Sequence, residues 1–238
     1  MAVAGLLLVL VTAAPARATM LEARGLIKAR HRTVLSSEIV GRVTAIPFRA
    51  GARFKKGAEL VRLDCSLLEA ERDKAAGGLK AARAQLNFHR ELEKLQSIGA
   101  LEVALDQARL EQRQAQWRIA SLSTARCSIR APYAGKVVQT IVNAHQSVRA
   151  QDELIEIVAI GTFEIEVMAP STWLSWLKPE SRFRVVIDET GDAFPARVAA
   201  IGAAVEPVSK MVLLRGRLEK TASSLVPGMG AVAYFEKR

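Results

Sequence analysis

The sequence has few of the residues that catalysis, metal binding and base stacking need. Its 238 residues include three histidines, two cysteines and only 5% aromatic residues. The histidines, His31, His89 and His145, stand apart from one another and from paired carboxylates, so we predict no metal site. The sequence contains no nucleophile elbow, phosphate-binding glycine loop or metal-binding helix motif. It therefore predicts a protein that is not an enzyme and holds no cofactor.

The sequence also lacks an apolar stretch of the roughly 20 residues that a membrane-spanning helix needs. Residues 1–18 contain a short apolar run, Leu6 to Val11, followed by Ala16-Arg17-Ala18, the small-x-small pattern of a signal-peptidase site. No Lys or Arg precedes the run, which leaves open a start inside a longer leader. We interpret residues 1–18 as a signal peptide, the alternative being a strand or helix of the folded protein. Export predicts an oxidising compartment, in which two cysteines can pair.

Acidic residues are outnumbered, and the formal net charge is +10. The excess is concentrated between Thr19 and Cys65, which carry ten basic and four acidic residues. The scarcity of aromatic residues and the export signal argue against a nucleic-acid partner. Attraction to anionic lipid or to an acidic protein face fits better, and a basic surface that serves solubility alone is the alternative.

An internal repeat gives the first clue to the fold. Residues 34–64, "VLSSEIVGRVTAIPFRAGARFKKGAELVRLD", align without gaps with residues 128–158, "SIRAPYAGKVVQTIVNAHQSVRAQDELIEIV", 94 positions later. Gly41 then falls on Gly135, and apolar positions coincide throughout. Each copy reads as short strands separated by turn residues. Two such halves are predicted to pack as a β-sandwich whose core neither could bury alone.

This repeat resembles the biotinyl/lipoyl-carrier fold. Gly51 and Gly57 occupy the expected turn positions in the first copy, whereas the second copy has His145 and Gln151 there, so we expect its turns to differ. A carrier domain holds a modifiable lysine on the hairpin that joins its halves. Here that junction is opened after Asp64-Cys65, and no such lysine remains. A carrier function is thus an alternative that lacks its essential residue.

The inserted segment, residues 65–126, is predicted to be an antiparallel coiled-coil hairpin. It is rich in Ala, Leu, Gln, Glu, Lys and Arg and has no proline. Ser66 and Glu69 have capping-box spacing, and Gly99 is expected to end the first arm. Residues at heptad spacing predict the two contact seams: Leu68, Arg72, Ala75, Leu79, Ala82, Leu86 and His89 on the first arm, and Leu101, Leu105, Ala108, Gln112, Ala115, Ile119 and Leu122 on the second.

The C-terminal third is predicted to form a small antiparallel β-barrel, because runs of alternating apolar and polar residues are separated by Pro and Gly. A short helix from Ser171 to Leu177 would close one end, with Trp173 and Trp176 as caps. The fold class is thus mostly β with a helical hairpin. The predicted division is a signal peptide (1–18), a strand that joins the barrel (19–33), the first sandwich half (34–64), the hairpin (65–126), the second half (127–159) and the barrel (160–238).

This order of parts resembles the periplasmic adaptors, or membrane fusion proteins (HlyD-like family), of bacterial tripartite efflux pumps and type I secretion systems. The motifs that carry the resemblance are "IRAPYAGKV" (129–137), "VEPVSKMV" (205–212) and "LVPGMGAVA" (225–233). The resemblance implies a non-catalytic periplasmic protein that forms homo-oligomers. It also implies an inner-membrane transporter and an outer-membrane channel, or another adaptor, as partners. A periplasmic ligand-binding module is a further alternative.

Three candidate sites follow from this interpretation. Adaptors that dock on outer-membrane channels carry an Arg-x3-Leu-x6-Ser pattern at the hairpin tip, but here Glu91 and Glu102 replace its Arg and Ser. We nevertheless predict a partner contact at the tip, formed by Arg90, Leu95, Ile98, Leu101 and Glu102. A second contact, with the transporter, is predicted on the barrel side and comprises Arg24, Lys28, Arg30 and Arg32.

The third candidate is a disulfide between Cys65 and Cys127. Residues that face each other across an antiparallel hairpin have position numbers with a constant sum, and the midpoint of 65 and 127 is 96, beside the predicted turn. The two cysteines therefore stand at the same level, where the chain leaves the sandwich and where it returns. Two separate buried thiols are the alternative.

Overall fold

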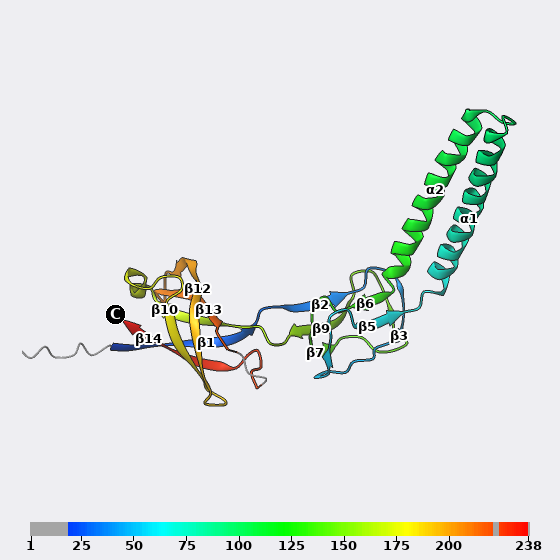
Figure 1. Ribbon diagram of the computed structural model, residues 1–238. Helices are drawn as coiled ribbons and strands as arrows, with labels where there is room; N and C mark the ends of the chain where they lie inside the picture. The colour runs from blue at the N-terminus through cyan, green and yellow to red at the C-terminus, as the bar shows by residue number, and fades with distance from the viewer. Residues whose placement is uncertain (1–18, 221–223, 238) are drawn as a thin grey trace, which may run out of the picture. The chain divides into compact units, whose positions relative to one another are not determined.

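The computed structural model describes residues 19–220 and 224–237 (Figure 1). The predicted signal peptide, residues 1–18, lies outside the described residues. The chain forms two compact units. One contains the N-terminal residues up to Arg30 together with the residues from Gly161 onward, and the other is His31–Ile160.

The first unit is an antiparallel barrel closed by six of the described strands. Along these strands alternating side chains point inward, as the sequence pattern predicts, except in residues 199–206, none of which is buried. The core includes Ile27, Ile165 and Phe235, each at most 1% exposed. Around the barrel the order is β1 (Thr19–Ala29), β10 (Phe163–Pro170), β13 (Met211–Leu218), β12 (Ala193–Glu206), β11 (Arg182–Ile187) and β14 (Gly230–Lys237).

The segment predicted as a short helix is a 3₁₀ turn, η1 (Ser171–Ser175). Trp173 enters the barrel core and stands edge-to-face with Phe235, at 5.3 Å between ring centroids. Trp176 packs against the same core while remaining partly exposed. Both tryptophans therefore cover this end of the barrel through packing.

The second unit contains a sandwich of two four-stranded sheets. One sheet has the order β2 (Arg32–Ser36), β9 (Glu153–Ala159), β7 (Gly135–Thr140) and β4 (Arg53–Phe54). The other has the order β6 (Ser128–Arg130), β5 (Glu59–Leu63), β3 (Gly41–Ala45) and β8 (Ser147–Val148). Each sheet takes two strands from each copy of the repeat, and a shift of 94 positions relates the strands of one sheet to those of the other. Because each sheet needs strands from both copies, neither copy has a core by itself.

The turns of the two copies share one conformation, which corrects the expectation that they differ. Gly51 and Gly57 have φ angles of 82° and 81°, and His145 and Gln151, their counterparts, have φ angles of 69° and 75°. The second copy therefore holds two non-glycine residues in the left-handed region, which costs about 1 kcal/mol each. The fold imposes the turn where the sequence does not favour it.

Between β5 and β6 the chain forms two helices that lie side by side, α1 (Ser66–Lys94) and α2 (Ala100–Ala125) (Figure 1). α1 begins without the predicted Ser66–Glu69 capping box: the Asp64 carboxylate instead accepts the N–H of Ser66, at 3.2 Å. Gly99 does not end α1, which stops at Lys94; it precedes α2, where the Glu102 side chain accepts the Gly99 N–H at 2.9 Å.

Candidate assembly surfaces on the hairpin and the barrel

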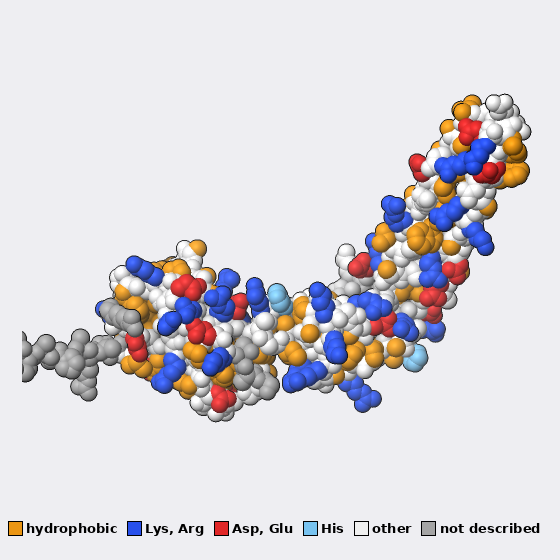
Figure 2. Space-filling model, viewed as in Figure 1, with side chains coloured by type: hydrophobic (Ala, Val, Ile, Leu, Met, Phe, Trp, Pro, Cys, Tyr) orange, Lys and Arg blue, Asp and Glu red, His pale blue; other side chains and the backbone are white. Residues whose placement is uncertain are grey.

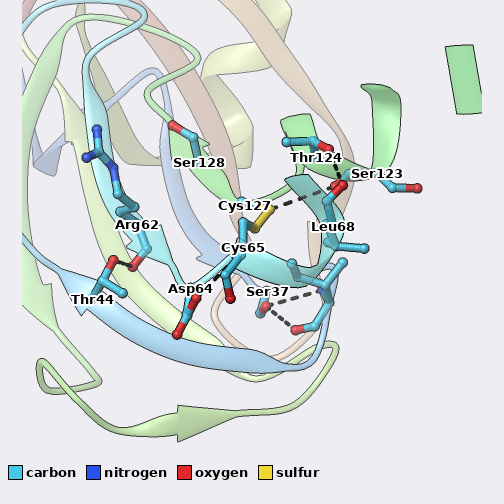
Figure 3. The surroundings of a disulfide bond; sticks show 12 residues. Ser37, Thr44, Arg62, Asp64, Cys65, Leu68, Ser123, Thr124, Cys127 and Ser128 are labelled. Atoms are coloured by element: carbon cyan, nitrogen blue, oxygen red, sulfur yellow. Dashed lines mark hydrogen bonds between the residues drawn. A yellow bond between two sulfur atoms is a disulfide. The ribbon is translucent and has the colours of Figure 1, made fainter. Parts of the chain in front are cut away.

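A disulfide joins Cys65 and Cys127 at the base of the hairpin (Figure 3). The sequence predicted this pair, and its Cα atoms are 6.1 Å apart. Both cysteines are buried, one just before α1 and the other just after α2. Beside the disulfide, the Thr124 hydroxyl donates a hydrogen bond to the carbonyl oxygen of Leu68, at 3.2 Å. The covalent bond and the hydrogen bond hold the two helices at one level.

Two carboxylates secure the strands that lead into and out of the hairpin. Hydrogen bonds from Ser66 and the Arg42 guanidinium lower the pKa of Asp64 below its usual value. Burial raises the pKa of Glu59, but hydrogen bonds from Ser128, at 2.5 Å, and Arg62 outweigh this effect, so the net shift is downward. Because Glu59 lies on β5 and Ser128 on β6, this contact joins the two halves of the sandwich.

The inner side of α1 is the side that the heptad pattern predicted. Leu86 is buried there, and the other predicted seam residues of α1 are partly buried. On α2 the predicted seam is wrong. The side facing α1 is displaced by two positions, so that Val103, Gln107, Leu110, Gln114, Ser121 and Thr124 are buried or partly buried.

The residues predicted as the α2 seam point away from α1. Leu101, Leu105, Ile119 and Leu122 are 72%, 52%, 65% and 60% exposed, although they have the heptad spacing of a contact surface. We call the exposed set Leu101, Leu105, Ala108, Gln112, Ala115, Ile119 and Leu122 the outer row. Hydrophobic side chains are visible along the hairpin surface in Figure 2. The more apolar of the two heptad faces of α2 is thus uncovered in the single chain.

The buried contacts of the two helices, all of whose residues the structure describes, gather near the tip. Leu86 on α1 and Asp106 and Leu110 on α2 are the buried residues. The Asp106 carboxylate lies 2.5 Å from the His89 ring across the hairpin and 3.1 Å from the Arg109 guanidinium. His89, predicted on the contact seam of the first arm, contacts a carboxylate of the opposite helix. Covalent attachment at the base and packing near the tip therefore hold the hairpin.

The structure divides the predicted tip residues into two kinds. Leu95 and Leu101 are each 72% exposed and have no apolar cover, while Ile98 is partly buried. Arg90 donates a hydrogen bond across the hairpin to Gln107, and Glu102 caps α2. The polar pair thus supports the tip, and the two leucines are its uncovered apolar surface.

The basic residues predicted to form one barrel surface are divided between the two units. Arg24, Lys28 and Arg30 belong to the barrel unit, where they lie near Asp188, Glu166 and Glu164 respectively. Arg32 lies in β2 of the sandwich and binds Glu156 at 2.7 Å. The expected strand 19–33 therefore ends in the barrel at Ala29, and each predicted basic side chain has an acidic neighbour.

Among the described residues, no group of three or more His, Cys, Asp or Glu side chains is arranged to hold a metal ion. Within residues 19–220 and 224–237, no helix has both the length and the apolar character that crossing a membrane requires. The junction where a carrier domain would present its lysine is occupied by the hairpin.

Two known proteins are similar to this chain in sequence. No family model matches the chain. An uncharacterized protein of Haemophilus influenzae is 26% identical over 214 residues, which are 86% of this chain and 54% of that protein. The nodulation protein NolF of Rhizobium meliloti is 25% identical over 181 residues, 70% of this chain and 48% of that protein. The chain thus spans about half the length of these two relatives.

Solved structures share the fold at low sequence identity. A MacA-MexA chimeric protein, which contains the Pseudomonas aeruginosa MexA α-hairpin domain, matches with a TM-score of 0.80 and 18% identity, over 92% of this chain and 81% of that chain. The membrane fusion protein Spr0693 from Streptococcus pneumoniae matches with a TM-score of 0.72 and 15% identity, over 91% and 98%. The chain shares its fold with these two solved structures.

Proposed function

We propose that the protein is a non-catalytic periplasmic adaptor, which links an inner-membrane transporter to an outer-membrane channel for efflux or secretion. In this proposal several copies stand side by side, and their sandwiches and hairpins enclose a conduit. The barrel contacts the transporter through Arg24, Lys28 and Arg30, and the hairpin tip contacts the channel or another adaptor through Leu95 and Leu101. The protein associates with the inner membrane through these partners.

The outer row of α2 is the observation that carries this proposal. A helix that packs against a single partner needs one apolar face, but α2 has two sides with heptad spacing. The side facing α1 includes glutamine, serine and threonine, while the outer row has leucine and isoleucine at four of its seven positions. An apolar surface of this kind indicates a contact with another molecule. Its heptad spacing supports a helix of a neighbouring hairpin as that contact.

Oligomerisation is tested by photo-crosslinking in cells that make the full chain. A photoreactive amino acid placed at Ile119 should join two copies, and Gln85, an exposed residue on a flank of α1, gives the control position.

Leu105→Asp combined with Ile119→Asp should reduce co-purification of differently tagged copies at least tenfold. Gln85→Asp combined with Asn87→Asp, at two exposed positions of α1, adds the same charge away from the row and should leave co-purification unchanged. Equal recovery of the two double variants would contradict the proposed assembly.

The adaptor role is tested separately from the ends of the molecule. Photo-crosslinking from Leu95 should capture an outer-membrane channel or another adaptor, and crosslinking from Lys28 should capture an inner-membrane transporter, both identified by mass spectrometry. In a chain without the probe, Leu95→Asp should reduce export, and Leu95 lies outside the outer row. If neither position captures a transport protein, the adaptor assignment is wrong even where the copies associate.

A further inference from the structure

A groove at the base of the hairpin lies outside the predicted sites. It has a volume of about 430 Å³ and lies where the end of α2 meets β2 and β6 of the sandwich. Leu35, Leu122 and Ile129 provide its apolar lining, and Arg126 and Arg130 add positive charge. Glu38 is its acidic residue and binds Arg126 at 3.2 Å. Because Leu122 is also the last residue of the outer row, the groove continues that apolar surface.

We infer that this groove receives Leu67 from a second copy of the chain, with the neighbouring Glu71 against Arg126 and Arg130. This inference rests on the proposed side-by-side assembly and names its contact at the base. Leu67, in the first turn of α1, is 71% exposed. The adjacent Leu68 is partly buried, but Leu67 has no apolar cover in its own chain.

Leu67 and the base groove lie at the same height along the hairpin, which supports this pairing. The Cys65–Cys127 disulfide and the Thr124–Leu68 hydrogen bond place the start of α1 beside the end of α2. In a closed ring of identical copies related by rotation, each residue meets residues of the next copy at its own level. The start of α1 of one copy therefore stands at the level of the base groove of its neighbour.

Charge complementarity favours a second copy as the occupant. The first two turns of α1 carry Glu69, Glu71 and Asp73 and one basic residue, Arg72, which binds Asp73 at 2.8 Å, so Glu69 and Glu71 remain as the acidic excess. Figure 2 shows acidic side chains on the lower part of the hairpin. Glu71 is four residues after Leu67, so both lie on one face of the helix.

Arg126 binds Glu38, and Arg130 lies 3.7 Å from Glu59 and donates a hydrogen bond to the Gly57 carbonyl oxygen. Both side chains remain exposed, at 53% and 61%, so an incoming carboxylate can also reach them. Opposite charges at this contact also fix which surface of the neighbour enters the groove.

The contact is tested by photo-crosslinking from position 67 in the full chain. Copies labelled with ¹⁵N are mixed with unlabelled copies, so that peptides joined between chains are recognised by mass. We expect residue 67 of one copy to join residues 122–130 of another. The same probe at Gln85, further along α1, should not reach these residues. A crosslink of residue 67 within its own chain, or to another region, would overturn the inference.

Charge exchange provides a second test. Glu71→Lys should weaken association between tagged copies at least fivefold, and Arg126→Glu should do the same. The double variant should recover at least half of the lost association, because the opposite charges are restored in exchanged positions. Arg126→Gln, which creates no repulsion with Glu38, should also weaken association. Glu22→Lys, at an exposed position of β1 in the barrel, should not. Additive losses in the double variant would contradict the contact.

The two proposals fail in different ways. If Ile119 joins two copies but residue 67 does not reach the groove, the side-by-side assembly stands and the base contact is wrong. A further probe is placed at residue 122, in the groove. If it joins residue 122 of another copy, the grooves of the two copies face each other in a two-fold dimer, and the inference is wrong. If neither Ile119 nor residue 67 joins two copies, both proposals fail.

Discussion

The sandwich and the hairpin belong to one compact unit, but different contacts hold them together. The sandwich buries a continuous core in which Val43, Leu60, Leu154 and Ile157 are fully inaccessible. The 29 residues of α1 and the 26 of α2 bury only Leu86, Asp106 and Leu110. The sandwich thus gains its stability from its own apolar core. The hairpin relies on a disulfide at its base, on a small core near its tip and, in our proposal, on neighbouring copies.

The largest expected difference between the two regions comes from removing apolar side chains. Ile157→Ala, in the sandwich core, should lower the free energy of unfolding by about 3 to 4 kcal/mol, because it leaves a cavity where the surroundings cannot collapse. Leu105→Ala, in the outer row, should change it by less than about 0.5 kcal/mol in the isolated chain. Urea unfolding followed by circular dichroism measures both. Similar losses for the two variants would show that the outer row is covered within the single chain.

Removing the disulfide should affect the hairpin more than the sandwich. The chain-entropy model gives at most about 4 kcal/mol for a loop of about 60 residues, and we expect about 2 to 3 kcal/mol from Cys65→Ser with Cys127→Ser. Hydrogen exchange should become faster in the first turn of α1 and the last turn of α2, while the buried strands β5 and β9 stay protected. Reduced wild-type protein is the control and should behave in the same way. Faster exchange throughout the sandwich would mean that the disulfide stabilises the whole unit.

Replacing glycine by alanine should stabilise the hairpin and destabilise the sandwich. Gly77 lies in the interior of α1 with no atom near the position of an added Cβ, so Gly77→Ala should stabilise the hairpin by up to about 1 kcal/mol. Gln151, in the sandwich, has a φ of 75°, and Gln151→Gly should relieve its strain by about 0.5 to 1 kcal/mol. Gly57→Ala, at the counterpart position with a φ of 81°, should lose about 1 kcal/mol. Thermal unfolding compares the three variants, and destabilisation by Gln151→Gly would refute the strain.

Acid should weaken the sandwich at the strands next to the hairpin. The pKa of Glu59 is lower in the folded protein than in the unfolded chain, so its contribution to stability is present above the unfolded value of about 4.3 and is lost as the pH falls through the folded value. Glu59→Gln should therefore destabilise the protein slightly at pH 7, and the difference from wild type should shrink as the pH falls below the unfolded value. Melting temperatures measured across this range test the prediction. A difference that grows as the pH falls would contradict it.

The repeat made the sandwich largely predictable from sequence, because apolar positions at period two and turn residues fix where strands begin and end. The alignment of Gly41 with Gly135 did not reveal that only Gly135 is closely packed. A Cβ on Gly135 would stand 2.2 Å from the carbonyl oxygen of Val158, whereas a Cβ on Gly41 would make ordinary contacts. The base groove also escaped prediction, since its lining comes from β2, α2 and β6, which are distant in the sequence.

The sequence by itself determined the kinds of elements in this protein and their order. Composition and heptad spacing predicted both helices, alternation predicted the strands, and the positions of Cys65 and Cys127 about the turn predicted their pairing. Only the tertiary structure decided which side of α2 meets α1. Heptad spacing marks a face suited to helix contact but does not name its partner, and the disulfide, the His89–Asp106 contact and the turn together rotate α2 so that Leu105 and Ile119 point outward.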